Sequence, residues 1–140
     1  MFPYSEPSEA GFNYIRNSVK VVVDAYDGDL IFYVIDQEDP VLGVYRQSMP
    51  ALFKPLDEMS EDLRRHLRYP QDLFQAQVEK YYAYHMTVPQ VFYNAEDLWA
   101  APREKYGGEV IQMRPYYVLM KLPEEDRLQF LLMTPLTPAN

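Results

Sequence analysis

Alternation of apolar and polar residues with a period of two marks the stretch from Ser18 to Asp36 as a pair of β-strands. Asp27-Gly28 lies at its centre, and this dipeptide between two β-rich runs is typical of a two-residue hairpin turn. Such a turn pairs Val23 with Phe32 and Val21 with Val34. All four side chains then lie on one face of the hairpin, and that face is apolar. We therefore predict a β-hairpin over residues 18–36 with that face buried.

A second alternating stretch runs from about residue 109 to residue 134, and an acidic turn at residues 123–126 divides it into two strands. Pro115 interrupts the first of these strands and removes a backbone donor, which predicts an edge strand or a bulge at that point. Residues 109–134 are therefore predicted to form a second hairpin. Gly107-Gly108 is assigned to the loop that precedes it.

Between the hairpins, residues 40–99 have the spacing of helices. Asp39 before Pro40 and Ser60 before two acidic residues are both suited to cap a helix N-terminus. The longest predicted helix covers about Pro70 to His85 and carries one stripe of largely apolar side chains. Two strands, a helical middle and two strands favour an α+β fold, in which an antiparallel sheet from both hairpins is covered by the helical middle.

The chain of 140 residues fits a single domain, which we place over residues 13–138 after an extended lead-in over residues 1–12. Its net charge of −8 argues against binding to nucleic acid or to an anionic membrane surface. The absence of Cys excludes disulfides and thiol chemistry from this segment. No apolar run approaches the roughly 20 residues that cross a bilayer, so the segment itself is predicted not to span one.

Candidate reactive groups are few. One acidic cluster comprises Asp24, Asp27, Asp29, Asp36, Glu38 and Asp39. Asp27-Gly28-Asp29 lacks the pattern of a calcium loop, and turn chemistry explains it. His66 and His85 stand alone on separate predicted helices, so no metal site is predicted, and His85 is interpreted as a helix cap. No phosphate-binding glycine pattern or serine nucleophile motif occurs, and no cofactor is predicted.

Four collinear strings carry a resemblance to a known family: residues 13–28, residues 66–85, residues 90–99 and residues 132–138. They read Asn-Tyr-Ile-Arg-Asn-Ser-Val-Lys followed by Val-Asp-Ala-Tyr-Asp-Gly, His-Leu-Arg-Tyr-Pro-Gln-Asp-Leu-Phe, Gln-Val-Phe-Tyr-Asn-Ala-Glu-Asp-Leu-Trp, and Leu-Met-Thr-Pro-Leu-Thr-Pro. The chain resembles a fragment of uncharacterised protein family 0182, which comprises large multi-pass bacterial membrane proteins. The resemblance implies a cell-membrane parent, with this segment in a soluble and extracytoplasmic region.

The resemblance carries no catalytic residue, so the favoured hypothesis is a non-catalytic structural or interaction module. Its partners are then the remainder of the parent protein or another envelope protein. The predicted interaction surface joins two aromatic-rich segments and comprises Tyr69, Asp72, Phe74, His85, Phe92, Tyr93, Asp97 and Trp99.

Two alternatives stay open at this stage. The first is an envelope hydrolase whose site is shared with other sequence, with Asp24, Asp72, His85 and Asp97 as the first residues to test. The second is a peptidase-regulating domain, because the Val-Asp-Ala-Tyr-Asp-Gly hairpin is similar to the strand–turn–strand pattern of small extracytoplasmic domains that regulate peptidases.

Overall fold

A computed structural model of the chain describes residues 5, 7, 8 and 11–139. It contains both helices and strands, which confirms the α+β class, and its strands are mostly paired antiparallel. The chain divides into two compact units, Met1–Tyr69 and Pro70–Asn140, and each is described by itself below. The single domain over residues 13–138 stays a prediction.

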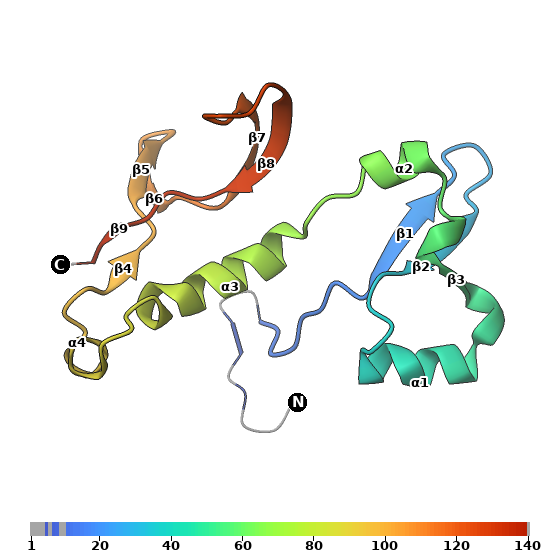
Figure 1. Cartoon of the computed structure of the whole chain (residues 1–140), viewed down its shortest axis with the longest axis horizontal. Helices are drawn as coiled ribbons and strands as arrows, with labels where there is room; N and C mark the ends of the chain where they lie inside the picture. Colours follow the sequence, from blue (N-terminus) through green and yellow to red (C-terminus); the bar gives the residue numbers. More distant parts are fainter. Residues whose placement is uncertain (1–4, 6, 9–10, 140) are drawn as a thin grey trace. The chain divides into compact units, whose positions relative to one another are not determined.

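The first unit contains a three-stranded sheet (Figure 1). Strands β1 (Val19–Val23) and β2 (Leu30–Val34) form the predicted hairpin, and β3 (Phe53–Pro55) adds to β2 in parallel. The register differs from the prediction by two residues, because Val23 pairs with Leu30 rather than with Phe32. A shift of two keeps every side chain on its predicted face.

The longer hairpin loop has a local cause. The Asp24 side chain accepts hydrogen bonds from the backbone N–H groups of Tyr26 (2.8 Å) and Asp27 (3.2 Å). The Gly28 N–H donates to the Asp24 carbonyl at 2.9 Å, and Gly28 takes a φ of 78°. These bonds stabilise a loop that is longer than a two-residue turn at Asp27-Gly28, so the paired part of the two strands ends earlier.

Burial in this hairpin also differs from the prediction. Val34 is 3% exposed, but Val21 and Val23 on the same face are 48% and 60% exposed. On the opposite face Tyr33 is 5% exposed. The parallel strand β3 pairs only with the Phe32–Val34 end of β2, so burial is concentrated there and the far end of the hairpin stays open.

The helices of the first unit begin where the sequence predicts. Asp39 caps α1 (Pro40–Ser48), and Ser60 caps α2 (Glu61–Arg65) through a bond from the Leu63 N–H. Two short 3-10 turns, η1 (Pro50–Leu52) and η2 (Leu56–Glu58), flank β3. The extended lead-in predicted over residues 1–12 falls largely on residues outside the described part, although the Gly11 N–H there closes a turn onto the Ser8 carbonyl at 2.9 Å.

The second unit begins with α3 (Gln71–Tyr84), which confirms the predicted long helix, followed by α4 (Pro89–Asn94). Strand β4 (Trp99–Ala100) packs against α3 and pairs with β9 (Thr137–Pro138). Two further ribbons follow: β5 (Arg103–Tyr106) with β6 (Glu109–Gln112), and β7 (Tyr116–Lys121) with β8 (Leu128–Met133).

The predicted second hairpin over residues 109–134 is therefore wrong in its first strand. Pro115 cuts that strand in two, and the earlier part turns back through Gly107 and Gly108, whose φ values are 59° and 93°. Positive φ at both central residues defines the turn that best connects two strands, so β6 pairs with β5 rather than extending β7. The Pro115 carbonyl accepts a hydrogen bond from the Gln71 side chain at the start of α3.

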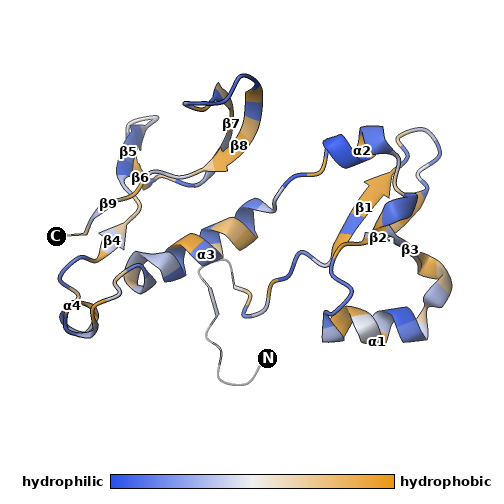
Figure 2. Cartoon of the chain, in the orientation of Figure 1, coloured by the Kyte–Doolittle hydropathy of each residue, from blue (hydrophilic) through white to orange (hydrophobic). Residues whose placement is uncertain are grey.

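The prediction of one sheet covered by the helical middle is also wrong. The described strands form four separate sheets, and the two predicted hairpins lie in different units. Buried apolar side chains are few among the described residues: Tyr33, Val34, Leu42, Met59, Val78, Met86 and Ala101. Figure 2 shows that strongly apolar residues instead follow strands such as β1 and β8. Most apolar side chains of the described residues are therefore at least partly exposed.

Candidate functional site

A compact group of side chains gathers at the C-terminal end of α3 and is called the His85 cluster here: Tyr81, His85, Asp97 and Trp99. The His85 and Trp99 rings stack with centroids 3.9 Å apart and an angle of 20° between their planes. The Tyr81 ring meets both of them edge-on or tilted, at 5.7 Å from His85 and 5.9 Å from Trp99. The cluster thus fastens the segment that leads into β4 onto the end of the helix.

Both nitrogens of the His85 ring lie close to an acceptor oxygen. Nδ1 lies 3.0 Å from the Tyr81 carbonyl oxygen, which can only accept, and Nε2 lies 3.3 Å from Oδ2 of Asp97. A neutral imidazole donates from one nitrogen only, whereas the imidazolium donates from both. A ring that carries both protons donates to both acceptors, whereas a neutral ring donates to one of them. The contact to Tyr81 agrees with the predicted role of His85 as a helix cap.

The polar atoms of the Asp97 and His85 side chains are already engaged with one another and with their neighbours. The Asp97 Oδ1 atom accepts a bond from Trp99 Nε1 at 3.2 Å, while Oδ2 faces His85. The His85 side chain is 8% exposed, and both of its nitrogens already face acceptors. A general base needs a ring nitrogen directed at the proton that it removes. The geometry is that of a structural clamp between α3 and the residues before β4.

The other members of the predicted interaction surface are placed less closely. Phe92 contacts Tyr84, beside His85, with ring centroids 5.4 Å apart, and Tyr93 on the same short helix is 89% exposed. Phe74 is half-buried in α3. The structure thus joins His85, Asp97 and Trp99 directly, with Phe92 next to them.

Asp72 does not join this group. Asp72 lies in the first turn of α3, and the thirteen residues from there to His85 correspond to roughly 20 Å along a helix. Tyr69 belongs to the first unit and is 41% exposed. Asp24 of the proposed hydrolase set lies in the first unit, where its carboxylate closes the β1–β2 loop.

A buried polar network in the first unit was only partly predicted. Asp39 is 6% exposed and Ser18 is 7% exposed, and the Ser18 hydroxyl donates a short hydrogen bond to Asp39 Oδ2. The Asp39 Oδ1 atom accepts from the Tyr14 hydroxyl at 3.2 Å and from the backbone N–H groups of Val41 (2.8 Å) and Leu42 (3.3 Å). The sequence indicates the cap on α1 but gives no signal for the partners at residues 14 and 18.

Hydrogen bonding also sets the ionisation of these acids. The Ser18 hydroxyl, helped by the two N–H groups at the start of α1 and by Tyr14, holds the pKa of Asp39 below its ordinary value, although burial acts in the opposite direction. The backbone N–H groups of Tyr26 and Asp27 likewise lower the pKa of Asp24. Within the described residues no group of three or more acidic or histidine side chains gathers to hold a metal ion.

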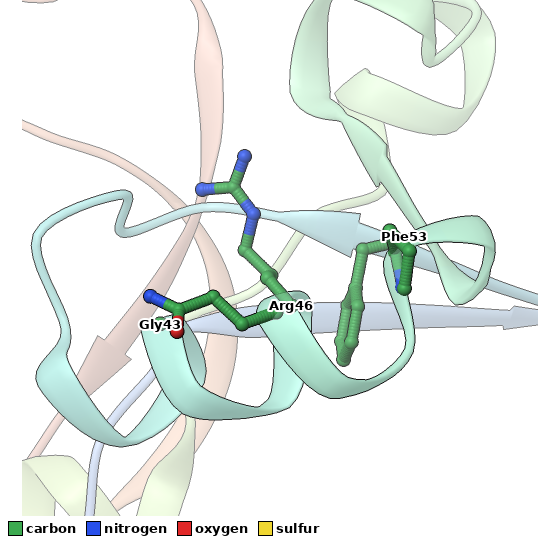
Figure 3. A pocket seen from close by; sticks show the side chains of 5 residues that line it. Gly43, Arg46 and Phe53 are labelled. Atoms are coloured by element: carbon green, nitrogen blue, oxygen red, sulfur yellow. The ribbon is translucent and has the colours of Figure 1, made fainter.

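An open depression of about 360 Å³ lies beside α1 in the first unit. It is lined by Gly43, Arg46, Gln47, Pro50 and Phe53. Figure 3 shows Arg46 extending from the helix, while the Phe53 ring lies against the helix end. The lining thus combines a guanidinium and an amide group with a proline and an aromatic ring.

Comparison with known proteins supplies the family. None of the described helices has the length and hydropathy that crossing a membrane requires. The profile of the Uncharacterised protein family (UPF0182) matches residues 1–140. The chain is similar to UPF0182 proteins of Pelotomaculum thermopropionicum (55% identity over 139 residues), Microcystis aeruginosa (54% over 139 residues) and Methanospirillum hungatei (52% over 145 residues).

Each of these three alignments covers 99% of this chain but only 14–16% of the relative. The chain therefore spans about 15% of the length of the curated relatives that it matches. No solved structure matches it. On the family profile and on these identities, the chain belongs to the Uncharacterised protein family UPF0182.

Proposed function

We propose that this chain is a non-catalytic structural module of a longer UPF0182 polypeptide, and that the remainder of that polypeptide covers its exposed apolar faces. The proposal includes the location that the family resemblance implies: a multi-pass membrane parent, with this segment on the extracytoplasmic side. The single observation that carries the structural role is the large surface, exposed apolar strand residues included, that the chain leaves in contact with water.

The solvent-accessible surface of the chain is 11281 Å². Two separate globular domains, each with half of the mass of 16.5 kDa, expose about 9,100 Å² together. The excess of roughly 2,200 Å² is large compared with the ~800 Å² that one partner contributes to a standard protein interface. The comparison with two separate domains already allows for the division into two units, so that division does not explain the excess.

The exposed surface includes strand residues that alternate toward one face. Val21, Val23 and Leu30 lie together on one face of the β1–β2 hairpin and are 48%, 60% and 54% exposed. In the second unit Leu119 and Phe130 are directly paired and are 60% and 48% exposed. Contiguous apolar patches of this kind mark interaction surfaces. Because the chain spans about 15% of its relatives, the rest of such a polypeptide is the nearest source of cover.

The structural role is tested by footprinting with a reactive carbene, which labels exposed side chains. Val21, Val23, Leu119 and Phe130 are expected to be labelled strongly in the isolated chain and several-fold less in the longer polypeptide. The fully unfolded chain gives the reference for complete exposure. Equal labelling of these residues in both proteins would show that nothing in the longer polypeptide covers them, and the proposal would then be wrong.

The location is tested separately. The chain contains no Cys, so Asp27→Cys at the exposed tip of the β1–β2 hairpin introduces the single thiol of this segment. In intact cells a membrane-impermeant maleimide is expected to label this variant in the full-length protein, and the full-length protein without the substitution is the control. Labelling only after permeabilisation contradicts the extracytoplasmic location, and recovery of the protein in the cytosolic fraction contradicts the membrane parent.

A hydrolase remains the second candidate because of one observation, the 3.3 Å contact between His85 and Asp97. Catalytic groups are commonly held at a cost in stability, so replacing them tends to stabilise the protein. A structural clamp predicts the opposite. Asp97→Ala is expected to destabilise the second unit by about 1–2 kcal/mol, since it removes the partners of His85 and Trp99. Glu96→Ala, at the neighbouring exposed acid, is the matched control, and stabilisation by Asp97→Ala alone favours the hydrolase.

A further inference from the structure

We propose that β8 receives a third β-strand on its outer edge, supplied by the remainder of the longer UPF0182 polypeptide. This inference rests on the proposed function and makes it specific, because it names the element that is completed and the kind of partner that completes it. Among the described residues, β7 and β8 pair only with each other. A two-stranded ribbon by itself is at best marginally stable in water.

Both faces of the β7–β8 ribbon are apolar. One face carries the stacked rings of Tyr117 and Phe130, whose centroids are 5.1 Å apart. The other face pairs Val118 with Leu131 and Tyr116 with Met133. A strand at the edge of a sheet with one face in water alternates apolar and polar residues, whereas a strand covered on both faces is apolar throughout. Apart from Lys121 on one face and Gln129 on the other, every residue of the two strands is apolar or aromatic, so the β7–β8 ribbon has nearly the composition of the interior of a larger sheet.

The edge of β8 lacks the features that protect a free edge. Its sequence, Leu-Gln-Phe-Leu-Leu-Met, contains no charge, no proline and no glycine. Natural edge strands are usually protected by charged side chains, by proline or by bulges. The β5–β6 ribbon of the same unit has that protection, with Arg103, Glu104, Lys105 and Glu109 along its strands. The contrast within one unit assigns β8, rather than β5 or β6, to pairing with another strand.

The outer edge of β7 is less suitable than that of β8 for pairing with an added strand. Lys121 places a charge within that strand, whereas no residue within β8 is charged. β8 is six residues long, and every second one of its backbone N–H groups points to its outer edge. An extended strand added there continues the sheet through main-chain hydrogen bonds.

The partner is a strand of the same polypeptide rather than a second copy. The curated relatives continue for about 85% of their length outside the region matched by this chain, since this region is 15% of it. A covalently linked segment is present at an effective concentration in the millimolar range, far above that of a second molecule. Because both faces at β8 are apolar, the added strand is expected to be a short, continuous apolar run of the Val/Ile/Leu type.

Hydrogen–deuterium exchange, read residue by residue with electron-transfer fragmentation, tests the pairing. In a two-stranded ribbon the N–H groups of each strand point alternately toward the partner and toward solvent. In the longer polypeptide all six amides of β8 are expected to be protected by at least about 100-fold, while alternation persists in β7. The β5–β6 ribbon is the internal control and is expected to alternate on both strands.

A matched pair of substitutions adds a second readout. Gln129→Lys places a charge in β8, and Gln112→Lys makes the same change in β6. In the longer polypeptide, the first is expected to reduce the protection of β8 by at least tenfold, and the second is expected to leave the β5–β6 ribbon unchanged.

Each remaining outcome overturns the pairing in a distinguishable way. Alternating exchange in β8 of the longer polypeptide means that no strand is added; if Leu119 and Phe130 are nevertheless shielded from the carbene, the structural module stands and only the pairing is wrong. Full protection of β8 in the isolated chain that increases with concentration assigns the edge to a second copy. Full protection of β7 with alternation in β8 shows that the strand is added to β7 rather than to β8.

Discussion

Replacing Asp39 is the sharpest test of how the first unit is held together. The carboxylate is 6% exposed and accepts four hydrogen bonds, from Ser18, Tyr14 and the N–H groups of Val41 and Leu42. Removing a helix cap costs about 1 kcal/mol. Leaving the buried Ser18 hydroxyl without its partner costs a further 1–3 kcal/mol or so. Asp39→Ala is therefore expected to lower the free energy of unfolding of this unit by about 3 kcal/mol.

A conservative replacement separates the shape of the side chain from its charge. In Asp39→Asn the amide oxygen still caps α1, because Asn and Asp are equally good caps. The amide nitrogen then faces the Ser18 hydroxyl, which can rotate to accept from it. Charge-assisted hydrogen bonds are stronger than neutral ones, so we expect a loss of about 1 kcal/mol. Glu38→Ala is the control for Asp39→Ala, because it truncates the exposed neighbouring acid in the same way. Its free energy of unfolding is expected to lie within about 0.5 kcal/mol of that of the wild type.

Urea unfolding followed by far-UV circular dichroism measures the loss. Native-state exchange of the Gly43 amide, which donates to the Asp39 carbonyl, places that loss in α1. In a double-mutant cycle, Ser18→Ala combined with Asp39→Ala is expected to cost about 1–2 kcal/mol less than the sum of the single changes, because no orphaned hydroxyl remains. If Asp39→Ala costs no more than Glu38→Ala, or if the two losses simply add, the buried network does not exist as described.

The same network predicts a pH dependence. The hydrogen bond from Ser18 and the cap bonds lower the pKa of Asp39 in the folded state below its ordinary value. A group with a depressed folded pKa contributes stability that is fully present above its unfolded pKa, about 3.9, and that is lost as the pH falls through the folded value. The stability difference between the wild type and Asp39→Asn is therefore expected to be constant near pH 7 and to shrink below about pH 4. A difference that grows on acidification contradicts the assignment.

Two further pairs of substitutions test the packing and the backbone. Val34→Ala at a 3% exposed position is expected to cost about 2 kcal/mol in the isolated chain. Val23→Ala, 60% exposed, is expected to stay within about 0.5 kcal/mol, and an equal loss in urea denaturation refutes the open face of this hairpin. Ala95 caps α4 with a φ of 52°, so Ala95→Gly is expected to stabilise the second unit by about 0.5 kcal/mol. Ala76→Gly inside α3 is expected to cost about 1 kcal/mol, and a loss at both positions in Trp99-monitored unfolding refutes the left-handed cap.

Local chemistry made the helices of this chain predictable. Asp39 and Ser60 cap α1 and α2 because a side-chain oxygen reaches an N–H group only two or three residues away. The long helix α3 starts one residue after Pro70 and ends one residue before His85, both of which mark its predicted bounds. Signals that act within a few residues are fully contained in the sequence window that displays them.

Strand pairing was predicted less well, because it depends on competing turns. Gly107-Gly108 carries the signal for a two-residue turn, and that signal was available beside the break at Pro115. Taken together, they indicate that the segment after Gly108 returns onto the one before Gly107, as the structure has it. The loop of the first hairpin differs for another reason, since the Asp24 side chain competes with the turn at Asp27-Gly28 for the backbone N–H groups.

Contacts between distant polar residues were beyond the sequence. Ser18 and Asp39 are 21 residues apart, and His85 and Asp97 are 12 apart. His85 and Asp97 were both placed on the predicted surface, but nothing in their spacing shows that they meet. Which hydroxyl reaches which carboxylate depends on the placement of whole elements, and one sequence without its contacts does not contain that placement.

The buried Asp39 carboxylate and the exposed apolar residues of β8 support the same interpretation. A self-sufficient domain covers its apolar strands first and leaves most carboxylates in water. Here Asp39 is buried with every bond satisfied, whereas β8, with no charged residue, has Leu128 65% exposed and Phe130 48% exposed. The precision of the Asp39 network argues that the chain is built to hold a defined structure. The open β8 edge is what the proposed cover by another part of a longer polypeptide predicts, because a chain that merely packs poorly has no reason to satisfy its buried acid so completely.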